Sequence, residues 1–153
     1  GDVYIHDWIF DRRDKSCTKP RVVAKILQHN IKMGQTEANN GGEEYSDDVH
    51  RILKEDYRYS INMSHKKAPT NMSKLSRIEQ HAPNIREFYF LDDAHRTDEY
   101  RRFMNELTGF SFTTKNVHDD APDSLGQLVE FIGYFTSVIW PVMAVSELID
   151  MIK

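Results

Sequence analysis

One histidine and three aspartates crowd into a short polar stretch that precedes a long apolar segment. They are His118, Asp119, Asp120 and Asp123. Pro122 suits the first turn of a helix, so the acids are predicted to lie where a turn enters that helix. Two carboxylates ~4 Å apart repel by roughly 4 kcal/mol in a partly screened environment, and a helix N-terminus offsets about 0.3–1 kcal/mol per charge. A shared proton or, more strongly, a divalent metal is the better compensation, which makes this stretch a candidate site for phosphodiester chemistry.

Glu37 is the second acidic position that could take part in chemistry, because it falls where a short predicted strand over residues 35–38 ends. Ligands of open α/β sheets collect beyond the carboxyl ends of strands, and the glycines within residues 39–42 allow a close approach of backbone and substrate. Two magnesium-like ions ~3.5–4 Å apart can activate an attacking water and stabilise a leaving oxygen. Glu37 and the Asp119–Asp120 pair meet this requirement if both elements end on one edge of the sheet. The alternative is an exposed glutamate before a turn.

The two residues that flank the aspartate pair each have a functional and a structural interpretation. His118 could orient a ligand, shuttle a proton or bind the scissile phosphate, or it could be a turn histidine that bonds backbone. Asp123 lies one turn into the helix, below Asp119 and Asp120. It is a candidate metal ligand, and the alternatives are a brace for the other ligands or a charge that favours the helix start.

A basic stretch with few apolar residues lies between the two acidic positions. It contains His65, Lys66, Lys67, Lys74 and Arg77. Its functional interpretation is contact with DNA phosphates near the acids, to which the loop amides Asn39 and Asn40 would add. Its structural interpretation is a solvated loop and helix face. Four further arginines are interpreted as surface charges, namely Arg12, Arg13, Arg101 and Arg102. Four aromatic residues are interpreted as core, namely Phe88, Tyr89, Phe90 and Phe103.

Hydrophobic periodicity and turn residues predict strands that alternate with helices. The predicted strands cover residues 3–10, 35–38, 57–63 and 85–91. The predicted helices run from a Thr18 cap to Gly34, over residues 43–55, over residues 74–81, from an Asp98 cap through Leu107, and from the acidic stretch onward. This alternation favours an α/β layered fold in one domain, and the 153 residues suffice for a hydrophobic core.

Composition limits the classes of function. A net charge of -4 excludes a chain-wide basic field, so any nucleic-acid surface must be a local patch. The single cysteine, Cys17, fits a reducing compartment. The uncharged residues 131–146 are fewer than the ~20 needed to cross a bilayer and are interrupted by Pro141, so no membrane span is expected. The N-terminus has no signal segment and starts inside a predicted strand, so we expect a protein that is not secreted and that has further sequence upstream.

Several segments are similar, in the same order, to motifs of one known family. They are residues 1–10, Thr-Lys-Pro-Arg-Val-Val at 18–23, Glu-Ala-Asn-Asn-Gly-Gly at 37–42, Lys-Leu-Ser-Arg-Ile at 74–78, residues 98–107, and Val-His-Asp-Asp-Ala-Pro-Asp-Ser-Leu at 117–125. Together they resemble the C-terminal nuclease domain of phage terminase large subunits, the RNase H-like nuclease of the viral DNA-packaging motor. The resemblance covers about residues 1–128, and an apolar helical tail at residues 129–153 extends beyond it.

The resemblance implies an RNase H-like mixed central sheet flanked by helices, in a single domain over residues 1–153. It implies an endonuclease that cuts concatemeric double-stranded DNA with two divalent ions, Mg²⁺ or Mn²⁺. Glu37 and Asp120 would be metal ligands with Asp119 in support, while Lys74 and Arg77 match a segment for which we expect DNA contact. The implied partners are the terminase ATPase domain, the small terminase subunit and the portal, in the host cytoplasm.

The chain departs from the family pattern in its N-terminal part. The family's first metal-binding aspartate and two strands of its sheet lie before residue 1, and no Gly-x-x-x-x-Gly-Lys-Ser/Thr loop of an ATPase occurs. We therefore expect an N-terminally truncated nuclease domain that cleaves poorly by itself. One alternative is a junction resolvase or integrase-like nuclease with similar acidic geometry. Another is a non-catalytic fragment that assembles with the packaging motor through its apolar tail.

Overall fold

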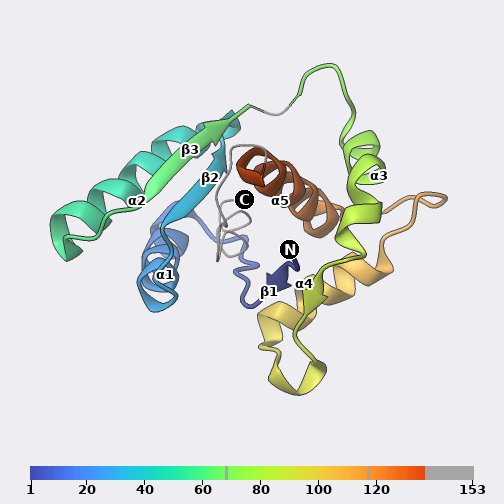
Figure 1. Ribbon diagram of the computed structural model, residues 1–153, viewed down its shortest axis with the longest axis horizontal. Helices are drawn as coiled ribbons and strands as arrows, with labels where there is room; N and C mark the ends of the chain where they lie inside the picture. The colour runs from blue at the N-terminus through green and yellow to red at the C-terminus, as the bar shows by residue number, and fades with distance from the viewer. Residues whose placement is uncertain (68, 117, 137–153) are drawn as a thin grey trace.

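The computed structural model describes residues 1–67, 69–116 and 118–136 (Figure 1). Its helices are α1 (Lys15–Gln28), α2 (Gly42–Tyr57), α3 (Lys74–Ile85), α4 (Asp98–Gly109) and α5 (Asp120–Thr136), with 3-10 turns η1 (Asn39–Gly41) and η2 (Asp93–His95). Its strands are β1 (Tyr4–Ile5), β2 (Met33–Glu37), β3 (Asn62–Lys66) and β4 (Tyr89–Phe90). The alternation of strands and helices confirms the mixed α/β class.

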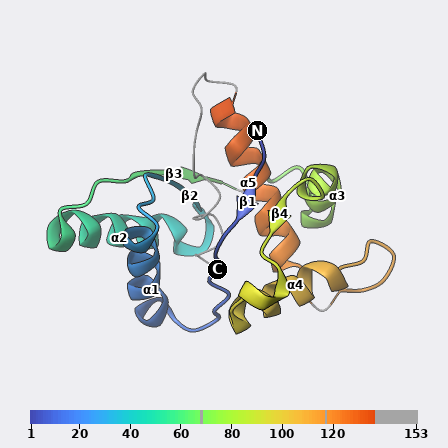
Figure 2. The same ribbon diagram turned by 60° about the horizontal axis from the view of Figure 1, so that its bottom comes forward.

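The strands pair in two small sheets. β1 pairs with β4 in parallel, with Tyr4 opposite Tyr89, and β2 pairs with β3 in parallel, with Glu37 opposite Lys66. Within the described residues no strand joins the two sheets, so the predicted single mixed central sheet is not present there. Figures 1 and 2 place β2, β3, α1 and α2 on one side of α5, and β4, α3 and α4 on the other. Side chains of both groups can therefore reach α5.

The first predicted helix begins and ends earlier than its sequence signals indicate. Asp14 is the N-cap of α1, because its carboxylate accepts the N–H groups of Ser16 and Cys17. Thr18 is inside the helix, where its hydroxyl oxygen accepts a hydrogen bond from Tyr45. The helix ends before Gly34, which lies within β2.

The later elements also shift their boundaries. Tyr57 still belongs to α2, and Arg58 closes that helix at φ 52°, so β3 begins after the predicted strand start. α3 continues past the predicted end to Ile85 and contains Pro83. Thr97 caps α4 in place of Asp98, which is the first helical residue. The predicted strands at 3–10 and 85–91 are reduced to β1 and β4.

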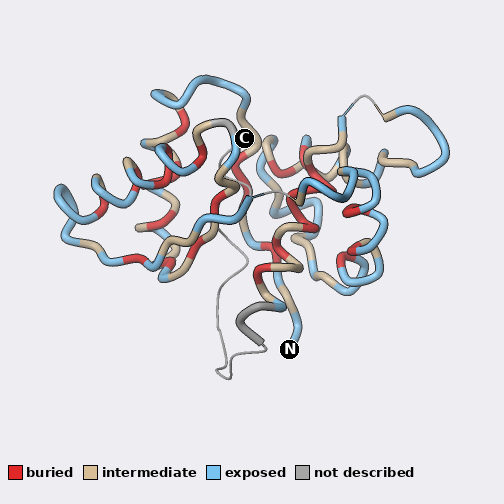
Figure 3. Tube along the Cα trace, turned by 90° about the horizontal axis from the view of Figure 1, so that it is seen from above, coloured by how far each residue is buried: buried red, intermediate tan, exposed pale blue. Residues whose placement is uncertain are grey.

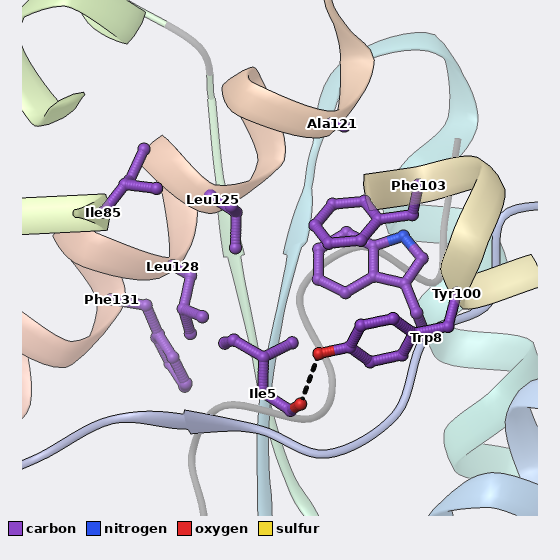
Figure 4. Close-up of a cluster of buried hydrophobic side chains, with 9 residues drawn as sticks. All are labelled: Ile5, Trp8, Ile85, Tyr100, Phe103, Ala121, Leu125, Leu128 and Phe131. Carbon is purple, nitrogen blue, oxygen red and sulfur yellow. Dashed lines mark hydrogen bonds between the residues drawn. The ribbon is translucent and has the colours of Figure 1, made fainter. Parts of the chain in front are cut away.

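Two hydrophobic clusters hold these elements together (Figure 3). The first contains Ile5, Trp8, Ile85, Tyr100, Phe103, Ala121, Leu125, Leu128 and Phe131 (Figure 4). The second contains Ile9, Val22, Val23, Ile26, Ile31, Tyr45, Val49, Leu53 and Ile61. Full burial of one such large side chain stabilises the fold by about 1.5–3 kcal/mol. Since one face of α5 belongs to the first cluster, the helix cannot rotate freely, and the direction of its acidic first turn is fixed.

Aromatic packing agrees with the sequence interpretation at three of four positions. Phe103 is fully buried and stacks on Trp8 with ring centroids 3.7 Å apart, and Phe88 and Phe90 pack against the same cluster. Tyr89 was predicted as core, but its side chain is exposed and stacks on Tyr4 at the surface of the β1–β4 pair. Alternation along a strand places it on the face opposite its partly buried neighbours Phe88 and Phe90.

None of the helices in the described ranges has the length and apolar character needed to cross a membrane. α5 continues from the acidic stretch as far as Thr136. Most of the predicted uncharged stretch at 131–146, and most of the predicted apolar tail at 129–153, falls in residues 137–153, which lie outside the described residues.

Candidate functional site

Acids from distant parts of the sequence line one pocket of about 540 Å³. Glu37 reaches the pocket from the end of β2, and Asp120 and Asp123 reach it from the first turn of α5. Lys74 and Arg77 line it from the first turn of α3. The structure therefore brings the two predicted acidic motifs to one place, together with two of the predicted basic residues.

The position of Glu37 is fixed by strand pairing and by the turn that follows. The pairing of β2 with β3 continues past Glu37, because the Ala38 N–H donates to Lys66 O at 2.9 Å. The chain then turns so tightly into α2 that a Cβ on Gly42 would lie 1.8 Å from Glu37 O. Asn39 Nδ2 donates to Glu37 Oε1 at 3.1 Å. The glycine and asparagine of this motif thus hold the glutamate in place.

The first turn of α5 presents the aspartates. Asp120 is the first helical residue, and the Asp123 N–H donates to Asp119 O at 3.2 Å. The N–H of Ala121, the second residue of α5, donates to Glu106 Oε1 of α4 at 2.8 Å. Acidic groups at this end of a helix are favoured by the helix dipole. The predicted turn into a helix, with acids at its start, is therefore present.

An ammonium group compensates the crowded carboxylates. Lys74 Nζ lies 2.7 Å from Asp119 Oδ1, 2.9 Å from Asp120 Oδ1 and 3.9 Å from Asp123 Oδ2. Burial lowers the pKa of Lys74, but hydrogen bonds to Asp119 and Asp120 outweigh burial, and the net pKa is raised. The lysine therefore stays charged, and it neutralises the aspartates in place of the metal or shared proton that the sequence predicts.

Asp123 is a buried anchor beneath the other two aspartates. Its side chain is 4% exposed, and its Oδ1 accepts a hydrogen bond from Arg77 Nη2 at 2.6 Å. Gln127 Nε2 lies 3.4 Å from Asp123 Oδ2 and donates to Glu37 Oε2 at 3.2 Å. This geometry agrees with a bracing role for Asp123, since its oxygens are already engaged by two side chains.

His118 lies at the rim of the site. It is exposed, and its Nδ1 is 3.0 Å from Arg12 Nη2. The same Arg12 nitrogen is 3.9 Å from Asp120 Oδ2. The histidine therefore bonds a side chain, which differs from the predicted alternative of a turn histidine that bonds backbone.

The other predicted basic residues lie next to the pocket. Lys66 Nζ pairs with Glu130 Oε2 at 2.5 Å, and the Lys66 and Lys67 side chains line a shallow neighbouring depression. His65, predicted in a loop, is in β3 and bonds Thr36 at 2.8 Å. Asn40 lies in η1, and its side chain is outside the described part of the chain. Of the predicted basic stretch, Lys74 and Arg77 are thus the residues that reach the aspartates.

Among the residues of the site that sequence reasoning missed, Gln127 and Arg12 make the contacts described above. Gln127 stands one helical turn after Asp123, and that spacing could have identified it as a neighbour on the same face. Arg12 was interpreted as a surface charge, but it lines the pocket and contacts His118. No local sequence signal distinguishes Arg12, because the contact depends on how the segment after β1 folds against the start of α5.

The donor chemistry of the pocket fits a hard divalent cation, since carboxylate and amide oxygens are the ligands that Mg²⁺ and Mn²⁺ prefer. In the part of the chain that is described, no three His, Cys, Asp or Glu side chains are grouped closely enough to hold an ion. Lys74 Nζ stands between the aspartates, where a cation would neutralise them. Binding of an ion at Asp119 and Asp120 therefore requires the lysine ammonium to withdraw.

Comparison of this chain with protein-family models, with curated proteins and with solved structures gives no match.

Proposed function

We propose that this chain is the metal-dependent endonuclease domain of a viral DNA-packaging terminase, with an RNase H-like fold, and that it cuts concatemeric double-stranded DNA. The observation that carries the proposal is that Glu37 and Asp120 line the same pocket. Two-metal hydrolysis needs carboxylates from separate elements to converge on one point. The order of the motifs along the chain supports the same family.

In this proposal Glu37, Asp119 and Asp120 hold Mg²⁺ or Mn²⁺, two ions that would activate a water and stabilise the leaving oxygen. Asp123 orients the aspartate turn through its contact with Arg77. Lys74 lies beside the same turn. Once metal ions neutralise its carboxylate partners, its ammonium would supply positive charge for a DNA phosphate.

The groups at the rim would meet the DNA. His118 and Arg12 form a bonded pair beside Asp120, where they can donate to the scissile phosphate. Lys67 is exposed and lines the neighbouring depression that Glu37 also borders, and Asn39 lines the acidic pocket itself. The proposal includes the partners that accompany this family, namely the ATPase domain, the small terminase subunit and the portal, and a location in the host cytoplasm.

Metal binding tests the proposal without depending on turnover. An ion that binds the folded state stabilises it by about 2.7 kcal/mol at 100 times its Kd, so millimolar Mn²⁺ is expected to raise the Tm of the chain. Glu37→Gln and Asp120→Asn should lose most of this shift. The matched control Glu79→Gln removes an exposed carboxylate of α3 that lies outside the pocket, and it should keep the shift.

Nicking of supercoiled plasmid DNA in Mn²⁺ is the matching activity test. We expect slow nicking by the parent chain and none by Glu37→Gln or Asp120→Asn. Unchanged nicking by both variants would refute the assignment. A parallel assay on a four-way junction separates the terminase proposal from a resolvase, since a resolvase would cut the junction in preference to linear duplex.

One observation favours a second candidate, a non-catalytic assembly module of the packaging motor. Lys74 already neutralises the aspartates, which is what a structural ion-pair cluster would need. Under this alternative Mn²⁺ would leave the Tm of the parent unchanged. Lys74→Met would then lower the Tm, and Mn²⁺ would not restore it. Under the nuclease proposal, Mn²⁺ would restore the Tm of Lys74→Met by taking the place of the ammonium.

A further inference from the structure

A second and larger cavity, of about 1130 Å³, adjoins the acidic pocket. It lies between the segment after β1, helix α4 and the loop that leads to α5, and we call it the arginine cleft. Arg12 and Arg13 line both cavities, so the cleft and the acidic pocket share a border. A ligand that extends beyond the acidic pocket at this border would enter the arginine cleft.

The charge of the cleft is positive although the chain is acidic. Its lining carries five arginine or lysine side chains against three carboxylates, in a chain whose net charge is -4. The basic residues are Arg12, Arg13, Arg21, Arg102 and Lys115. A concave surface with one dominant sign of charge raises the local concentration of ligands of the opposite sign. The cleft therefore favours an anionic ligand.

The three carboxylates of the cleft already accept hydrogen bonds from groups within the protein. Asp11 accepts hydrogen bonds from Arg13, which lower its pKa, and from Arg21 at 2.5 Å. Glu99 accepts from Arg21 at 2.5 Å and from the Phe10 N–H at 2.9 Å. Glu106 accepts the Ala121 N–H at the start of α5. These acids are therefore not available to neutralise the remaining basic groups.

Two basic side chains stay uncompensated. Arg102, on α4, and Lys115, in the loop before α5, are both exposed, and neither has a carboxylate partner within the residues that the structure describes. The loop that carries Lys115 is closed by Asn116, whose amide donates to Ser111 O at 2.6 Å and accepts the Ser111 N–H at 2.9 Å. Lys115, next to this pair of hydrogen bonds, lines the cleft.

We propose that the arginine cleft binds the phosphate backbone of duplex DNA beside the acidic pocket, with Arg102 and Lys115 as phosphate contacts. This inference rests on the proposed nuclease function, and it assigns the place where the uncut part of the duplex lies. Arg12 joins the two cavities, since it borders the cleft and also contacts His118. The contacts are to phosphate, so the cleft positions the duplex without reading its sequence.

The test is the salt dependence of DNA binding by the full chain in EDTA, where no cleavage occurs. The probe is a fluorescent 20-base-pair duplex followed by anisotropy. Each phosphate contact makes affinity fall about 3.5-fold between roughly 50 and 200 mM salt. We compare the affinity of the parent with that of the double variant Arg102→Gln/Lys115→Gln. The ratio of the two affinities should be about 12-fold larger at the lower salt than at the higher salt. For each single variant, the same ratio should be about 3.5-fold larger at the lower salt.

The matched control is Arg51→Gln/Lys54→Gln, which removes the same two kinds of charge from exposed positions of α2 that line neither cavity. It should give a ratio that does not change with salt. Equal salt slopes for the parent and the cleft variant overturn the inference and leave the nuclease proposal intact, because Glu37 and Asp120 are tested separately. Tighter binding of single-stranded RNA than of the duplex, or no binding of either, also overturns it.

Discussion

Gln127 Nε2 donates a hydrogen bond to Glu37 Oε2 across 3.2 Å, although the two residues stand 90 positions apart in the chain. The same nitrogen is 3.4 Å from Asp123 Oδ2. A side-chain amide carries two N–H donors and no charge. Gln127 therefore lets the carboxylates of β2 and α5 approach one another without repelling directly, and it links the two acidic motifs physically.

Gln127→Glu should destabilise the fold at neutral pH, because it replaces this donor by a third carboxylate. The repulsion from each neighbouring carboxylate lies between about 1 kcal/mol in water and about 4 kcal/mol at partial screening. The new carboxyl would have a raised pKa in the folded state, so the defect is absent below the unfolded pKa of about 4.3 and grows as pH rises above it. Urea denaturation at several pH values measures it.

Gln127→Met is the control, because it removes the donors and adds no charge. Its destabilisation should be smaller at neutral pH and should change less with pH. A Gln127→Glu variant that is as stable as the parent at about pH 8 would contradict the arrangement, since it would mean that Glu37 and Asp123 are not close to this position.

The ion pair between Arg77 and Asp123 predicts strong coupling between the two residues. Both side chains are largely buried, at 11% and 4% exposed, and Arg77 Nε has no hydrogen-bond partner in the described part of the chain. Removing one partner of a buried pair costs about 3–5 kcal/mol, because the other charge stays buried. Arg77→Met alone should therefore destabilise by that amount, while Arg77→Met/Asp123→Leu should recover most of it.

Chemical denaturation of the two single variants and the double variant measures this coupling. Strict additivity of the single effects would sink the claim that the pair acts as a unit. Recovery in the double variant is expected because a buried pair is often no more stabilising than apolar side chains of similar volume.

The sequence predicted the local parts of this site well. The glycine-rich turn after Glu37 and the acidic helix start at Asp120 both follow from residues within a few positions, and both are present. The ammonium of Lys74 was not predicted as the compensating charge, because the contact depends on the packing of α3 against α5. Likewise the separation of β1 and β2 into two sheets depends on pairing over long distances, which periodicity does not encode.

The lowered pKa of Glu130 predicts that the stability of the fold depends on pH. Burial raises its pKa, but hydrogen bonds from Lys66 at 2.5 Å and with His81 at 3.0 Å outweigh burial, and the pKa falls below its ordinary 4.5. A lowered folded-state pKa means that the stabilisation is fully present above pH 4.5 and is lost as pH falls through the folded-state pKa. Glu130→Gln should remove roughly 1 kcal/mol at neutral pH after solvent screening.

The check is the difference in unfolding free energy between the parent and Glu130→Gln as a function of pH. It should be largest above pH 4.5 and should shrink below it. A difference that stays constant down to about pH 3 would show that the carboxylate charge of Glu130 does not contribute.

Gly42 and Gly126 offer a matched pair of glycine-to-alanine substitutions. Gly42 begins α2 with φ -67°, an ordinary helical value, so alanine meets no backbone strain there. Its Cβ would nevertheless lie 1.8 Å from Glu37 O, a backbone atom that cannot turn aside. A Cβ on Gly126, inside α5, would meet His81 Cδ2 at 3.4 Å, which is an ordinary contact.

Gly42→Ala should therefore destabilise the protein by about 1–3 kcal/mol, as overpacking does, and it should also displace Glu37 and abolish the Mn²⁺-dependent rise in Tm. Gly126→Ala should be neutral or should stabilise by up to about 1 kcal/mol, since alanine favours a helix interior over glycine. Urea denaturation and thermal unfolding with Mn²⁺ measure both effects. Equal stability of the two variants would mean that the start of α2 can shift independently of Glu37, and the turn would then not be what positions that carboxylate in the pocket.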